Sequence, residues 1–281
     1  MKMLQKIIIF SLVMCFGLGT VFAQSSIVKK DLSQAEIDKI IKNVAEKEGE
    51  FREALKNYVF NRFAVIQTVG FGGQITGEFR RDSFLTFNSD GARFEKILFA
   101  PISTLRDLTI TPEDLEDLGG VNPFALDPYV INQYKFDYLG KEKVDELDLY
   151  VFDVTPKVIP DPKKTKLRLF TGRIWVDDRD LQIVKSKGKA IPETKDNKFP
   201  IVETWRENID GKYWFPAYSL STGQDGELVF GSGQVVRLKM RVKYSDYRQG
   251  RSDVKILDDD VVDETTKPKP TPTPTKTPIQ P

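Results

Sequence analysis

Two groups of acidic residues are the first candidates for chemistry. Asp177, Asp178 and Asp180 follow one another closely, and clustered carboxylates suit Ca²⁺. A calcium-binding loop also needs a glycine at its turn and a distal glutamate, and neither stands at the required position. The sequence therefore favours a solvated hairpin tip over a metal site, and we expect no bound metal.

The second group is the pair Glu203 and Glu207, which would share one face of a strand with Trp205 between them. An acid–base pair must converge on a cleft that gives the two carboxylates different environments, and spacing along a strand does not provide this. The chain has no histidine, which excludes Ser-His-Asp and Cys-His catalysis and ordinary zinc hydrolysis. We therefore expect no catalytic residues, no enzyme activity and no cofactor.

Basic residues form a third group near the end of the folded region. Arg237, Lys239, Arg241 and Lys243 alternate with apolar residues, so they would line one face of a strand whose other face is buried. Such a row of cations is either plainly solvated or faces an anionic partner. We call these four residues the basic stripe, and both interpretations stay open at this point.

The N-terminal residues have the layout of a secretory signal. Lys2 and Lys6 precede an almost wholly apolar run over residues 7–18, and Ala23 is a small residue at the expected cleavage position. The run is shorter than the roughly 20 residues of a membrane-spanning helix. The sequence therefore predicts export to the periplasm, possible association with the outer membrane, and removal of residues 1–23, with an uncleaved anchor as the alternative. Removal takes away the only cysteine, Cys15, and changes the formal net charge from +1 to about −1, which argues against nucleic-acid binding.

Beyond the signal, the chain reads as one helix followed by a long antiparallel meander. Residues 32–58 form an amphipathic helix in which Ser33 and Glu36 make a capping-box pattern and Glu48 interrupts the apolar stripe. Alternating runs separated by turn residues follow, including strands at 74–81, 83–88 and 199–209, and Asp210-Gly211 is the strongest hairpin signal. One domain is expected over residues 33–256. Residues 258–281, acidic and then rich in Thr, Pro and Lys, are expected to form a disordered tail.

Residues 101–129 break the strand pattern. Thr111-Pro112 predicts the start of a short helix, Gly119-Gly120 predicts its end, and an apolar loop follows over 121–126. An apolar loop needs a surface to cover, so this one either plugs the core or forms a flap that faces a ligand. The helix at 32–58 has the same two interpretations, packing on a sheet or acting as a movable lid.

Phenylalanines crowd three of the expected strands and occur on both strand parities. If both faces are apolar, one face meets a helix and the other lines a cavity, although core packing is the default role of any single phenylalanine. The candidate residues for an apolar cavity and its lid are Phe51, Leu55, Phe79, Phe84, Phe87, Phe94 and Phe124.

Three stretches carry a family resemblance. Residues 140–145 lead into Leu149-Tyr150-Val151-Phe152-Asp153-Val154-Thr155-Pro156, and Gly172-Arg173-Ile174-Trp175-Val176-Asp177 and Gln182-Ile183-Val184-Lys185 follow. With the signal, the leading helix and the meander, this order resembles the LolA/LolB-like outer-membrane lipoprotein-sorting superfamily of periplasmic lipoprotein carriers. The resemblance implies an α+β fold that is mainly antiparallel β. It would be a curved, half-open β-barrel covered by an N-terminal helix and a helical or loop lid.

The resemblance also implies a function, because members of this kind hold acyl chains in an apolar cavity and do no chemistry. We expect an exported carrier or sensor that binds a lipid, a lipoprotein acyl chain or another apolar ligand under the helix at 33–58 and the loop at 101–128. The alternative is a non-enzymatic envelope interaction protein whose core is filled by its own side chains. The expected partners are the lipid or lipoprotein ligand and a transient membrane or envelope-protein contact. Nucleic acid is not expected, and the protein is expected to be a monomer.

Overall fold

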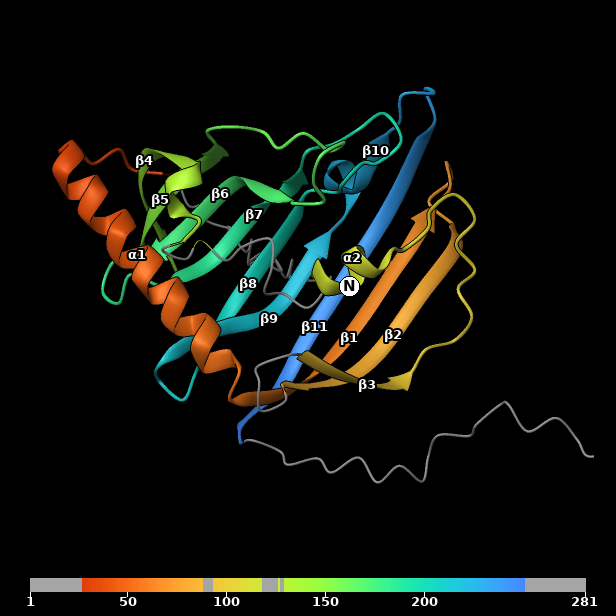
Figure 1. Cartoon of the computed structure of the whole chain (residues 1–281), viewed down its shortest axis with the longest axis horizontal. Coiled ribbons are helices and arrows are strands. Elements are labelled where there is room, and N and C mark those ends of the chain that lie inside the picture. The colour runs from red at the N-terminus through yellow and green to blue at the C-terminus, as the bar shows by residue number, and fades with distance from the viewer. Residues whose placement is uncertain (1–26, 88–92, 118–125, 127–128, 251–281) are drawn as a thin grey trace, which may run out of the picture.

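The first helix packs against a single large sheet in the computed structural model, which describes residues 27–87, 93–117, 126 and 129–250 (Figure 1). The helix α1 (Gln34–Leu55) is capped by Ser33, whose hydroxyl accepts from the Glu36 N–H while the Glu36 carboxylate accepts from the Ser33 N–H at 2.8 Å. This confirms the capping box. The predicted signal at 1–23, the tail at 258–281 and the helix end at 119–120 lie outside the described residues.

The described residues form eleven strands in one antiparallel sheet. The order across the sheet is β3-β2-β1-β11-β9-β8-β7-β6-β5-β4, and β10 pairs with β11. The sheet curves without closing on itself, so the expected fold class of a half-open barrel is confirmed (Figure 1). The strands are β1 (Tyr58–Val69), β2 (Ile75–Phe87), β3 (Arg93–Phe99), β4 (Tyr134–Val144), β5 (Leu147–Pro156), β6 (Leu169–Asp177), β7 (Ile183–Ile191), β8 (Val202–Ile209), β9 (Tyr213–Ser221), β10 (Glu227–Val229) and β11 (Val235–Gln249).

Two strand predictions from the sequence can be compared with the structure, one for a hairpin and one for a strand boundary. Asp210 and Gly211 have φ values of 55° and 66°, which is the twist that a tight hairpin between β8 and β9 requires, so the hairpin prediction is confirmed. The prediction of two separate strands at 74–81 and 83–88 is wrong, because β2 runs through Asp82. The Asp82 carboxylate is satisfied there by two hydrogen bonds from Arg80, at 2.7 and 3.2 Å.

The sheet has two faces with different covers. We call the face that carries α1 the inner face and the opposite one the outer face. On the inner face, the C-terminal half of α1 packs in a core cluster with Phe60, Phe215 and Met240, and Val44 from the same helix joins a second cluster with Phe152 and Phe170. A third cluster, around Leu149, Val151 and Trp175, is separate from these two, so β5 is buried on both sides.

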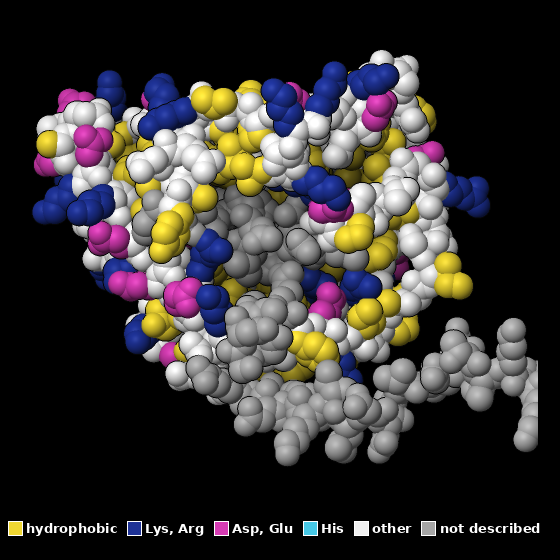
Figure 2. Space-filling model, in the orientation of Figure 1, with side chains coloured by type: hydrophobic (Ala, Val, Ile, Leu, Met, Phe, Trp, Pro, Cys, Tyr) yellow, Lys and Arg dark blue, Asp and Glu magenta, His cyan; other side chains and the backbone are white. Residues whose placement is uncertain are grey.

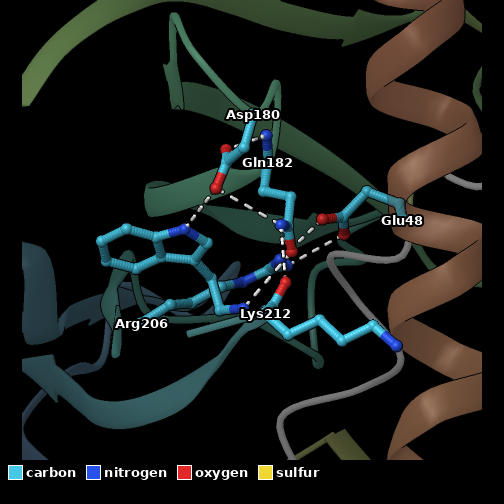
Figure 3. A network of polar contacts seen from close by, with 6 residues as sticks. Glu48, Asp180, Gln182, Arg206 and Lys212 are labelled. Atoms are coloured by element: carbon cyan, nitrogen blue, oxygen red, sulfur yellow. Dashed lines mark hydrogen bonds and ion pairs between the residues drawn. The ribbon is translucent and has the colours of Figure 1, made fainter. Parts of the chain in front are cut away.

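A buried ion pair fixes α1 to the inner face (Figure 3). Glu48, at the centre of the helix, accepts hydrogen bonds from both terminal nitrogens of Arg206 on β8, at 2.6 and 2.9 Å. The Arg206 guanidinium also lies over the Phe51 ring, 4.6 Å from its centroid. Glu48, which interrupts the apolar stripe, therefore packs against the sheet together with the apolar residues of that stripe. None of the helices in the described residues combines the length and apolar character that crossing a membrane requires.

Candidate functional site

A cavity of about 480 Å³ lies on the inner face, away from α1. Its floor comes from the centre of the sheet, where β1 contributes Ile66 and β11 contributes Leu238, Met240 and Val242. The wall across β7 and β8 adds Ala190 and Val202, while Phe199 and Phe230 approach from loops. Pockets of about 300–1,000 Å³ with mainly apolar walls are typical of small-ligand sites.

The cavity is covered by the segment that precedes the short helix α2 (Pro112–Asp117). Leu108 and Ile110 of this segment line the cavity and pack against the core. The segment can lie close to β2 because Gly77 has no side chain, since a Cβ atom there would sit 2.6 Å from the Thr104 carbonyl oxygen. Thr104 and Glu78 then bond through their backbones at 2.9 Å. Residues 107–111 of the segment 101–129 thus cover a cavity. The apolar loop at 121–126, expected as a core plug or a flap, lies outside the described residues except for Leu126, which is buried in the second core cluster.

Ion pairs hold α2 at one side of the cavity. Thr111 and Asp114 form reciprocal capping bonds of 2.9 and 3.2 Å, which confirms the predicted helix start. Arg168 reaches Asp114 at 2.9 Å and lies over the Phe199 ring at 4.6 Å. Lys166 bonds Glu113 at 2.7 Å and lowers the pKa of that carboxyl to about 2. Since Lys166 and Arg168 directly precede β6, these contacts join α2 and the covering segment to the start of that strand.

Glu193 organises the rim beyond β7. It accepts a hydrogen bond from the Phe199 N–H at 3.1 Å, and its carboxylate lies 3.0 Å from Lys189 and 3.7 Å from Lys198. Burial alone would raise the pKa of Glu193, but the bond from Phe199 and the neighbouring lysines hold it below its ordinary value. The ionised form of Glu193 is thus the one that keeps Phe199 against the cavity.

The cavity floor carries one polar spot. Thr204 on β8 and Ser219 on β9 are buried, line the cavity and share a hydrogen bond of 2.8 Å. In this bond one hydroxyl donates and the other accepts, so each oxygen has a partner within the protein.

The two candidates on α1 do not line the cavity. Phe51 and Leu55 are each 1% exposed and belong to the core cluster, where Phe51 packs tilted on Phe215 at 5.6 Å between centroids. In the described structure they hold α1 to the sheet. The cavity is covered instead by residues 107–111 and by the loop around Phe199.

The other phenylalanine candidates divide between the two faces. Phe79 pairs with Ile66, lies on the inner face and is partly buried against the core. Phe84 and Phe94 have the opposite strand parity and lie on the outer face. The Phe87 side chain and Phe124 lie outside what the structure describes. Among the described side chains of this set, none lines the cavity, and Phe79 pairs with Ile66, which does.

The basic stripe lies on the outer face of β11, as its alternation predicts. Arg237 pairs with Glu227 at 3.0 Å. Within the described residues, Lys239, Arg241 and Lys243 are exposed and form no ion pair. The residues opposite them on β1 and β9 are uncharged, namely Phe63, Val65, Gln67, Tyr218 and Leu220.

The acidic candidates have structural partners. Asp178 bonds Lys141 at 2.5 Å, and Asp180 accepts from the Trp214 indole N–H at 2.9 Å in the network with Gln182 that Figure 3 shows. Glu203 accepts from the Trp205 indole N–H at 2.8 Å and lies 3.2 Å from Lys185. Among the residues described, no group of His, Cys, Asp and Glu is arranged to hold a metal ion.

Sequence reasoning missed most of the cavity residues. Ile66, Met240 and Val242 appear in the sequence as ordinary inward strand positions. Phe199 and Pro200 fall in the expected strand 199–209, but the strand begins at Val202, so both belong to the loop beside the cavity. Pro200 was the available signal, because proline is disfavoured inside a central strand.

The comparisons with known proteins found similar solved structures and no match in sequence. No family model matches the sequence, and no curated protein matches it. A DUF1329 family protein from Desulfovibrio piger is 16% identical, with a TM-score of 0.40 over 78% of this chain and 95% of that one. A domain from Vibrio parahaemolyticus described as outer membrane lipoprotein-sorting is 13% identical, with a TM-score of 0.35 over 78% and 96%. The complex of MucA and MucB from Pseudomonas aeruginosa contains a chain that is 10% identical, with a TM-score of 0.26 over 75% and 100%. A lipoprotein-sorting domain is thus among the structural neighbours.

Proposed function

We propose that the protein is an exported carrier or sensor that binds an acyl chain or another apolar ligand in the cavity of the inner face. The observation that carries this proposal is the cavity itself, about 480 Å³ in volume and floored by Ile66, Leu238, Met240 and Val242. Moving each CH₂ group of a ligand from water into such a site contributes about 0.8 kcal/mol, so a long chain binds without any covalent step.

The arrangement of charges supports binding without chemistry. Two carboxylates that hold the cover, Asp114 and Glu193, are engaged by Arg168 and by Lys189 and Lys198, while Asp107 and Asp196 also line the cavity. Both pairs hold covering segments in place. We propose that they retain the cover, and that the protein releases its ligand unchanged. The location in the periplasm remains part of this proposal and rests on the signal-like layout of residues 1–23.

Filling the cavity tests the proposal. Ile66 and Val65 are neighbours on β1 that lie on opposite faces, and only Ile66 lines the cavity. We expect Ile66→Trp to reduce binding of a neutral fluorescent apolar probe, while Val65→Trp binds it as the original protein does. Circular dichroism of both variants checks that the sheet is retained.

Mass spectrometry of organic extracts from the purified protein supplies the second measurement. The proposal expects a co-purifying lipid that decreases in Ile66→Trp and not in Val65→Trp. Absence of lipid together with no uptake of the probe by the original protein would reject the carrier. That result would favour the envelope interaction protein with a self-filled core.

A further inference from the structure

Two arginines lie on the inner face beside the cavity. Arg62 on β1 pairs in register with Ser83, and Arg81 on β2 pairs with Ala64. Residues that face each other in a register share one side of the sheet, and Ala64 has the same strand parity as Ile66. Both arginines therefore share the face that carries the cavity. Figure 2 looks onto this face and shows Lys and Arg side chains around its centre.

The neighbours of the two arginines place them next to the cavity wall. Arg62 pairs with Tyr244 of β11, and Tyr244 lines the cavity. Arg81 is the diagonal neighbour of Ile66, which lines the cavity from β1. Diagonal neighbours across strands are about 7–8 Å apart, a span that a long side chain covers.

Arg62 is fixed by partners of its own. It is fully buried and forms an ion pair with Glu95 on β3, and the Ser83 hydroxyl donates to the same carboxylate at 2.5 Å. Glu95 is the one carboxylate among the described inner-face residues of β1, β2 and β3. Arg62 and Glu95 thus balance each other, and the charge of Arg81 is left over.

Arg81 lacks such partners. Its Nε atom is buried and has no hydrogen-bond partner. Within the part of the chain that the structure describes, its guanidinium also forms no ion pair. The Arg81 side chain as a whole is half-buried, but a buried donor atom of a charged group is costly without a partner, because it has lost its water and gained no hydrogen bond. An anion delivered to this position would relieve that cost.

We propose that Arg81 is the head-group subsite of the cavity, and that the ligand is an anionic amphiphile whose carboxylate or phosphate binds Arg81 while its acyl chain lies along the apolar floor. This inference rests on the proposed function, which supplies the site for the chain. Carboxylate and phosphate share the chemistry that a guanidinium recognises, two oxygen acceptors in one plane. The Arg62–Glu95 pair is then a positioning group, since it occupies Glu95 and prevents this carboxylate from neutralising Arg81.

The test compares ligands that differ only in the head group. Palmitate, hexadecanol and hexadecyl phosphate are each used to displace a neutral fluorescent apolar probe from the purified protein. We expect the two anions to bind roughly tenfold or more tighter than the alcohol, because a hydrogen bond to a charged group contributes on that scale. In Arg81→Gln this preference disappears, while the affinity for hexadecanol stays the same. Arg81→Lys, which keeps the charge and loses the planar fork, restores part of the preference.

Arg80→Gln is the matched control. Arg80 is the next residue on β2, lies on the outer face and pairs with Asp82 at 2.7 Å. The inference expects Arg80→Gln to keep the full preference for anions. Unchanged binding of hexadecanol by Arg81→Gln shows that this variant is folded.

The outcomes separate the inference from the proposed function. Equal binding of palmitate and hexadecanol by the original protein overturns the head-group subsite and leaves the carrier standing. A preference for anions that survives in Arg81→Gln also overturns the subsite. Failure of the original protein to bind any of the three ligands or the probe overturns both. A preference confined to hexadecyl phosphate assigns the subsite to phosphate, and a preference confined to palmitate assigns it to carboxylate.

Discussion

Glu48 of α1 and Arg206 of β8 form a two-pronged ion pair in which both side chains are almost wholly buried, 1% and 4% exposed. The two residues are 158 positions apart in the chain. Their bonds of 2.6 and 2.9 Å join the only long helix among the described residues to the middle of the sheet. The helix that the sequence left open as a movable lid is therefore anchored at its centre.

Removing one partner of this pair leaves the other charge buried and unmatched. We expect Glu48→Ala to lower the free energy of unfolding by about 3–5 kcal/mol, measured by urea denaturation. The control is Glu50→Ala, which breaks the exposed pair with Lys47 and should cost no more than about 0.5 kcal/mol. The double variant Glu48→Leu, Arg206→Met removes both charges and should recover much of the loss. If Glu48→Ala costs as little as Glu50→Ala, the pair does not anchor α1.

The rim of the cavity should loosen in acid. The pKa of Glu193 lies below its ordinary value of 4.5, so its ionised form stabilises the folded rim. That contribution is present above pH 4.5 and is lost as the pH falls through the lowered pKa of the folded protein. We expect retention of a neutral apolar probe to be constant down to about pH 5 and to fall below pH 4.5. Lys189 and Lys198 are the cations that face Glu193.

The control for the acid effect is Glu193→Gln, which cannot ionise. This variant should retain the probe less well at neutral pH and lose the step below pH 4.5. A step of unchanged size in Glu193→Gln would assign the acid effect to other carboxylates.

We expect the basic stripe to contribute to binding of anionic surfaces and not to the stability of the fold. Lys239 and Arg241 are exposed, so we expect Lys239→Glu, Arg241→Glu to change the free energy of unfolding by no more than about 0.5 kcal/mol per substitution. We expect the original protein to co-sediment with vesicles that contain anionic lipid at low salt, and the double variant to remain in solution. Arg237→Gln, which changes a residue already paired with Glu227, is the control. Equal sedimentation of all three proteins would leave the stripe as plainly solvated charge.

The local signals in the sequence predicted the local structure well. Ser33 with Glu36, and Thr111 before Pro112, mark helix starts, and the capping bonds found at both places join residues three positions apart. Asp210-Gly211 marks a hairpin because both residues adopt the positive φ that the turn requires. The alternation in β11 is readable because one face is buried and the other is wet.

The site was harder to predict because it depends on which distant strands meet. Phe84 and Phe94 were grouped with Phe79, and their faces became clear only from the register of β1, β2 and β3. Glu48 appeared as a flaw in an apolar stripe, since nothing near it in the chain announces Arg206. The cavity joins β1, β7, β8 and β11 with two loops, so no single stretch of sequence contains it.

The pairing of β1 with β11 has a consequence for how the chain folds. The strands β1, β2 and β3 join the rest of the sheet only through β11, the last strand that the structure describes. The β1–β3 unit is built from neighbours in the chain and can form early, but β1 keeps an open edge until residues 235–249 pair with it. An open edge invites pairing with other chains, and contacts between distant segments form slowly. The cavity, which takes part of its floor from β11, is therefore completed late in folding.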